Sequence, residues 1–103
     1  MIVTFKSKAS ANISMQGDTA IRLIKMTGHS GSVPGAILAA HTALALNHLQ
    51  SALQHRPDET VDDTDNDGEA EVHVSLKVRA FPLIQMLENA ARQDCDVMWD
   101  QGF

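Results

Sequence analysis

The chain has 103 residues, of which 44% are apolar and 4% aromatic, with a single cysteine and a formal net charge of −5. This length supports one hydrophobic core and excludes two, so the sequence predicts a single domain over residues 1–103. One cysteine excludes an intrachain disulfide, and neither a membrane-spanning stretch nor a signal-peptide pattern is found, so we expect a cytoplasmic protein without membrane association.

The first predicted elements are a strand and a helix. Residues 2–8 alternate apolar and polar side chains, a pattern typical of a strand with one solvent-facing side. Ser14 is a suitable N-cap for a helix that runs to about Thr27. Gly28 would end that helix by adopting a left-handed backbone conformation.

The middle of the chain predicts a loop, a short strand and a second helix. Turn-forming residues fill 28–35, and 36–39 are apolar enough for a short buried strand. Thr42 is a candidate cap for a helix from 43 to about 55. An acidic, flexible loop is then expected at about 56–70, because this segment is rich in carboxylates and has few apolar residues.

The last third predicts strand, helix and strand. Residues 71–79 alternate strictly, Pro82 can open a helix, and 96–100 can form a final strand. The order predicts an α+β fold, a small two-layer sandwich of about four strands with three helices mainly on one face. Segments 3–9 and 74–80 match in residue type at six of seven positions, which suggests, without establishing, an internal repeat.

Three segments of the chain resemble a known family. They are Met-Ile-Val-Thr-Phe-Lys-Ser-Lys-Ala at 1–9, Met-Thr-Gly-His-Ser-Gly-Ser-Val-Pro-Gly-Ala-Ile-Leu at 26–38 and Arg-Ala-Phe-Pro-Leu-Ile at 79–84. Together they resemble domain of unknown function family 1840, small uncharacterised bacterial proteins, over most of the chain except the acidic loop. The resemblance implies a bacterial cytoplasmic protein and supplies no activity and no assigned site residues.

The glycine-rich loop is one candidate binding site. Its candidate ligand-binding residues are Gly28, His29, Ser30, Gly31, Ser32 and Gly35. Glycines let backbone N–H groups approach a ligand and serines add donors, as phosphate or another small anion requires. The loop lacks a P-loop lysine and a dinucleotide-binding spacing. A hydrolase-like use of Ser30 with His29 ranks third, since the nucleophile-elbow glycine is missing, and a simple turn is the structural alternative.

A basic surface is the other candidate site. It comprises Lys6, Lys8, His73, Lys77 and Arg79. If the two alternating strands are neighbours, these side chains share the open face of the sheet and would bind an acidic protein partner. The alternative is a charged face that only keeps the sheet soluble. The negative net charge and the absence of interleaved aromatic residues argue against nucleic acid.

Metal chemistry is not predicted. His41, His48 and His55 recur every seven residues, about 10 Å apart along a helix, which is too far for chelation. We interpret them as a polar stripe. Residues 63–68 match only the first half of a calcium loop, because Val74 occupies the position of the bidentate carboxylate.

The function predicted first is therefore a non-enzymatic interaction module that uses the basic sheet face, because no nucleophile, acid and base assemble into a motif. A small-ligand or phosphate-binding protein using the glycine-rich loop is the alternative. We expect no cofactor and no metal. The sequence leaves open a homodimer.

Overall fold

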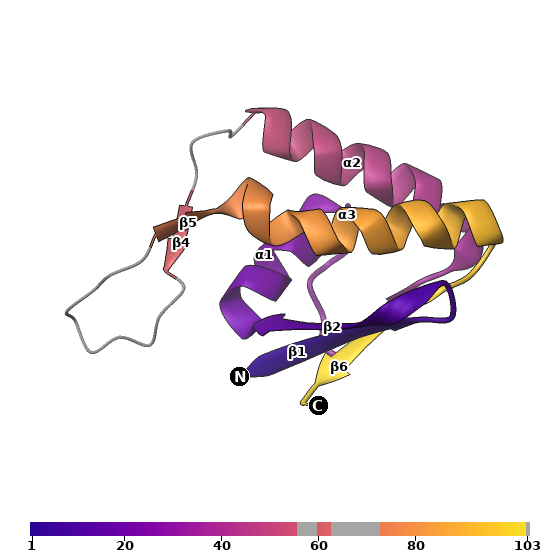
Figure 1. Cartoon of the computed structure of the whole chain (residues 1–103), viewed down its shortest axis with the longest axis horizontal. Coiled ribbons are helices and arrows are strands. Elements are labelled where there is room, and N and C mark those ends of the chain that lie inside the picture. The colour runs from indigo at the N-terminus through magenta and orange to yellow at the C-terminus, as the bar shows by residue number, and fades with distance from the viewer. Residues whose placement is uncertain (56–59, 63–72, 103) are drawn as a thin grey trace.

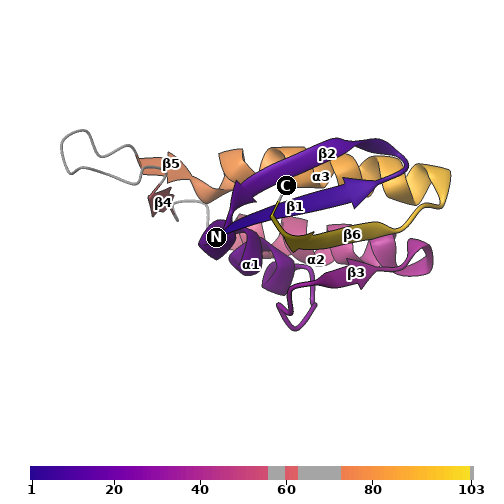
Figure 2. The same ribbon diagram turned by 90° about the horizontal axis from the view of Figure 1, so that it is seen from below.

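The computed structural model describes residues 1–55, 60–62 and 73–102. Its elements are β1 (Ile2–Ser7), β2 (Ser10–Gln16), α1 (Gly17–Met26), β3 (Gly35–Ile37), the 3₁₀ turn η1 (Ala39–His41), α2 (Thr42–His55), β4 (Thr60–Asp62), β5 (His73–Ser75), α3 (Leu76–Gln93) and β6 (Val97–Gln101). An antiparallel sheet has the order β2-β1-β6-β3, and β4 pairs with β5 as a separate ribbon. The three helices lie on one face of the sheet (Figures 1 and 2). The α+β prediction is confirmed.

Strand β1 lies in the interior of the sheet because it pairs with β2 on one side and β6 on the other (Figure 2). Phe5 faces Ile13 across the first pairing and Trp99 across the second. Val3, Phe5 and Trp99 are at most 2% exposed and belong to the cluster formed with the helices. The expectation that Trp99 anchors the core is therefore confirmed.

Strand β2 replaces the beginning of the helix that the sequence predicted. Ser14 is not an N-cap: it lies in β2 opposite Thr4, and the two hydroxyl oxygens are 2.9 Å apart. Ile13 and Met15 alternate with it and pack against the core. This alternation is a strand pattern, so α1 starts only at Gly17.

The end of α1 is as predicted. Its buried residues include Ala20, Leu23 and Ile24, at helical spacing. Gly28 follows with φ of +97° and donates its N–H to the carbonyl of Lys25 at 3.0 Å. Glycine adopts this conformation without the steric cost that a Cβ brings, and so ends the helix.

The strand predicted over residues 71–79 is wrong from Leu76 onward, and residues 71 and 72 lie outside the described residues. Only His73–Ser75 form β5, and α3 begins at Leu76. The buried positions then follow helical rather than strand spacing: Leu76, Ala80, Leu83, Leu87 and Ala90. Pro82 lies inside this helix instead of opening it, so it cannot donate a backbone hydrogen bond to the carbonyl four residues earlier.

The second helix, α2, ends at His55 as expected, but Thr42 does not cap it. The Thr42 hydroxyl donates to the carbonyl of Ala39 in η1 at 2.9 Å. In the segment expected as an acidic loop at 56–70, Thr60–Asp62 form β4. The rest of that segment, including the half calcium motif at 63–68, lies outside the described residues.

Within the described ranges, none of the helices combines the length and the apolar character needed to cross a membrane.

Candidate functional site

A cleft of about 360 Å³ lies between the end of α1, β3, η1 and the start of α2. It is lined by Thr27, Gly28, His29, Ala36, Ile37, Leu38, His41, Leu44, Ala45 and His48. Among these, Ile37 and Ala45 are 9% and 5% exposed, whereas Leu38 and Leu44 are 56% and 55% exposed. Buried apolar side chains beside exposed leucines are typical of a surface that an apolar ligand group covers.

Three histidines contribute the cleft's ionisable side chains: His29 follows α1, His41 ends η1 and His48 lies on α2. The Nδ1 atom of His48 is 3.2 Å from the carbonyl oxygen of Thr27. Because a carbonyl oxygen only accepts, His48 carries a hydrogen on Nδ1 in this contact. In His29, Nδ1 instead accepts the N–H of Gly31 at 3.2 Å, which leaves the ring hydrogen on Nε2.

Trp99 holds the glycine-rich loop in place beside the cleft. Its Nε1–H donates to the carbonyl of Ser32 at 2.8 Å, and its ring meets His29 edge-on with centroids 4.9 Å apart. A Cβ on Gly35 would approach the indole to 2.7 Å. Gly35 therefore serves the close packing of β3 on Trp99.

The structure brings only part of the predicted glycine-rich site to the cleft. Gly28 and His29 line it; Ser30, Gly31, Ser32 and Gly35 do not. The hydroxyl oxygens of Ser30 and Ser32 are 3.0 Å apart on the exposed side of the loop. Since His29 Nδ1 is bonded to Gly31, these contacts do not pair Ser30 with His29 as a hydrolase would need.

The five residues of the predicted basic face do not lie on one common surface. Lys6 lies on β1, Lys8 in the β1–β2 turn, His73 on β5, and Lys77 and Arg79 on α3. The β1–β2 turn and the start of α3 lie at opposite ends of the molecule (Figure 1). The premise of two neighbouring alternating strands is wrong, because the chain is helical from Leu76 onward.

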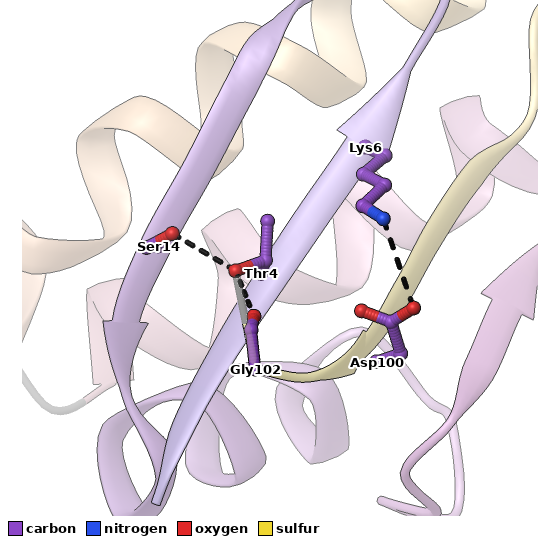
Figure 3. A network of polar contacts seen from close by, with 5 residues as sticks. All are labelled: Thr4, Lys6, Ser14, Asp100 and Gly102. Atoms are coloured by element: carbon purple, nitrogen blue, oxygen red, sulfur yellow. Dashed lines mark hydrogen bonds and ion pairs between the residues drawn. The ribbon is translucent and has the colours of Figure 1, made fainter.

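Lys6, on the open face of the sheet, forms an ion pair within the sheet. The ammonium of Lys6 is 3.7 Å from a carboxylate oxygen of Asp100 on β6 (Figure 3). Beside this pair, the Thr4 hydroxyl donates to the carbonyl of Gly102. These contacts tie β1 to the end of β6.

The histidines on η1 and α2 were missed as site residues. A spacing of seven residues excludes His41 and His48 as a chelating pair, yet places both on one side of the chain. Both residues line the cleft that His29 also lines. No set of three or more His, Cys, Asp or Glu side chains in the described part of the chain could hold a metal ion.

A family model described as Domain of unknown function (DUF1840) matches residues 1–99, a range that includes every element of the cleft. The chain belongs to this family. No curated protein and no solved structure matches the chain. Membership of the DUF1840 family confirms the resemblance carried by residues 1–9, 26–38 and 79–84, and the function has to be argued from the cleft.

Proposed function

We propose that this DUF1840 protein binds a small, partly apolar ligand in the cleft between the end of α1, β3 and α2, and that it works in the cytoplasm. The main observation in support is that the cleft places buried and exposed apolar side chains side by side. Ile37 and Ala45 are nearly buried, whereas Leu38 and Leu44 are more than half exposed. Exposed leucine side chains cost free energy in water, and a ligand that covers them recovers it. The volume of about 360 Å³ is within the range of small-molecule sites.

The same lining supports binding without covalent chemistry. The only hydroxyl in the lining belongs to Thr27, and it donates to the carbonyl of Ile24 within α1. No cysteine, serine or lysine is among the ten lining residues. Histidines can move protons, but nucleophilic catalysis also needs an activated nucleophile in reach.

The other predicted function was docking of an acidic protein on the basic face. It needed one surface with Lys6 and Lys77 side by side. These residues lie on β1 and α3, and Lys6 is paired with Asp100. The contacts described favour the cleft over that face.

The test is an amide NMR titration of the ¹⁵N-labelled full chain with hexanoate, hexanamide and 1-hexanol. We expect at least one probe to give saturable shifts at Gly28, His29 and residues 36–38. A ligand of this size is expected to bind with Kd of about 0.1–10 mM. Saturable shifts only at other amides, or none at all, contradict the proposed site.

Matched variants separate the cleft from general surface hydrophobicity. The double variant Leu38→Ala, Leu44→Ala should raise Kd by about fivefold or more, because the ligand covers less apolar surface. The control is Val78→Ala, Phe81→Ala, whose side chains are each 60% exposed on α3 and do not line the cleft. Equal weakening by both double variants would refute the cleft as the binding site.

A further inference from the structure

The ionisable side chains that line the cleft are imidazoles, which can become positively charged but not negatively charged. Its ten lining residues include three imidazoles and neither aspartate nor glutamate. Lys25 adds a cationic side chain beside the loop, since its aliphatic carbons lie against Gly31. A carboxylate does contact η1, since Oδ1 of Asp96 accepts the N–H of Ala39 at 2.7 Å, but Asp96 is not among the lining residues. A cationic ligand would find no carboxylate among the lining residues, whereas an anion can accept hydrogen bonds from imidazole N–H groups.

The hydrogen bonds already made within the protein define what the histidines can offer. Gly31 fixes the ring hydrogen of His29 on Nε2, so this nitrogen is a donor. Thr27 fixes a hydrogen on Nδ1 of His48, so Nε2 of that ring accepts when the ring is neutral and donates when it carries a second proton. A carboxylate suits both rings in their donor forms, because its oxygens accept from Nε2–H of His29 and from Nε2–H of His48 when that ring carries a second proton.

The apolar part of the cleft defines the body of the ligand. Ile37 and Ala45 form a nearly buried surface, and Leu38 and Leu44 stand exposed beside it. At about 30 Å³ per water-sized group, the cleft holds roughly a dozen such groups. That is enough for a carboxylate with a short hydrocarbon chain.

Building on the proposed small-ligand function, we infer that the cleft selects short-chain aliphatic carboxylates. The imidazoles of His29, His41 and His48 bind the carboxylate, and the hydrocarbon chain covers Leu38 and Leu44.

The experiment compares three molecules that share a hexyl-sized body and differ in the head group: hexanoate, hexanamide and hexylammonium. Each is titrated into the labelled full chain, and Kd is taken from the amide shifts of Gly28, His29 and residues 36–38. We expect hexanoate to bind at least about tenfold more tightly than hexanamide, and hexylammonium to give no saturable shift. His29→Gln and His48→Gln should each bring the Kd of hexanoate to within about threefold of the Kd that the same variant shows for hexanamide.

Two further variants keep the test decisive if either substitution disturbs the loop. His41→Gln changes an exposed side chain on η1 and should weaken hexanoate binding more than hexanamide binding. Gln50→Ala, an exposed residue of α2 outside the lining, should change the binding of neither ligand. Equal Kd values for hexanoate and hexanamide, or tightest binding of hexylammonium, would overturn carboxylate selectivity and leave the small-ligand function standing. Absence of saturable cleft shifts with all three probes and 1-hexanol would overturn both.

Discussion

Two seven-residue segments of this chain have nearly the same pattern and adopt different structures. Residues 3–9 are Val-Thr-Phe-Lys-Ser-Lys-Ala, and residues 74–80 are Val-Ser-Leu-Lys-Val-Arg-Ala. The first segment forms most of β1, between β2 and β6. The second contributes two residues to β5 and then becomes the first turn of α3. The two segments are therefore not an internal structural repeat.

Burial shows why the two segments differ. In the first, Val3 and Phe5 join the apolar core at a spacing of two, and the polar Thr4 between them, which is also buried, instead forms hydrogen bonds with Ser14 and Gly102. In the second, Leu76 and Ala80 are fully buried while Val78 between them is 60% exposed, which is a spacing of four. The second segment leads into further buried residues at helical spacing, so alternation over seven residues is outweighed by the longer apolar stripe of α3.

The largest expected effect is the difference in free energy of unfolding between the variants Leu76→Ala and Val78→Ala. Leu76→Ala should lower the free energy of unfolding by about 2–5 kcal/mol, because it removes buried methyl groups. Val78→Ala should leave it unchanged or raise it by about 0.5 kcal/mol, because alanine is the better helix former at an exposed position. Urea unfolding of both variants checks this; a Val78→Ala loss comparable with that of Leu76→Ala would mean that the two side chains share a buried face, as in a strand.

The fold class could be predicted because it depends on which segments are apolar, not on where each element begins. Helices at 17–26 and 42–55, the stop at Gly28 and the core position of Trp99 were all recognisable. The residues at which several of these elements begin could not be recognised from the sequence. Serine is common both as an N-cap and on the polar side of an edge strand such as β2, and only the pairing of Ser14 with Thr4 distinguishes the two.

Only the part of the candidate site that lies in one continuous segment could be predicted from the sequence. Gly28 and His29 were identified because a glycine-rich loop is visible locally in the sequence. His41 and His48 become site residues only because η1 and α2 pack beside that loop, which is a tertiary fact. The basic face failed for the opposite reason, since it assumed that two strand-like segments were neighbours in one sheet.

A second prediction uses the lysine that occupies the same place in both segments. Lys6→Pro should cost about 3 kcal/mol or more, because β1 is an interior strand and proline removes a donor and clashes in the ladder. Lys77→Pro should cost only about 1 kcal/mol, because the first N–H groups of α3 have no intrahelical acceptor. Thermal unfolding followed by circular dichroism compares the two, and similar losses would argue that both lysines lie in paired strands.

The smallest effect concerns the charges of the same two lysines. A double-mutant cycle with Lys6→Gln and Asp100→Asn should give a coupling free energy of at most about 0.5 kcal/mol, because exposed ion pairs contribute little. The two side chains are 43% and 49% exposed and 3.7 Å apart. The coupling should vanish in 1 M NaCl, where the Debye length is about 3 Å. The matched cycle with Lys77→Gln and Asp100→Asn should give none at either salt concentration, because α3 lies in the helical layer. Coupling of Asp100 to Lys77 as strong as its coupling to Lys6 would restore the shared basic face and weaken the case for the cleft.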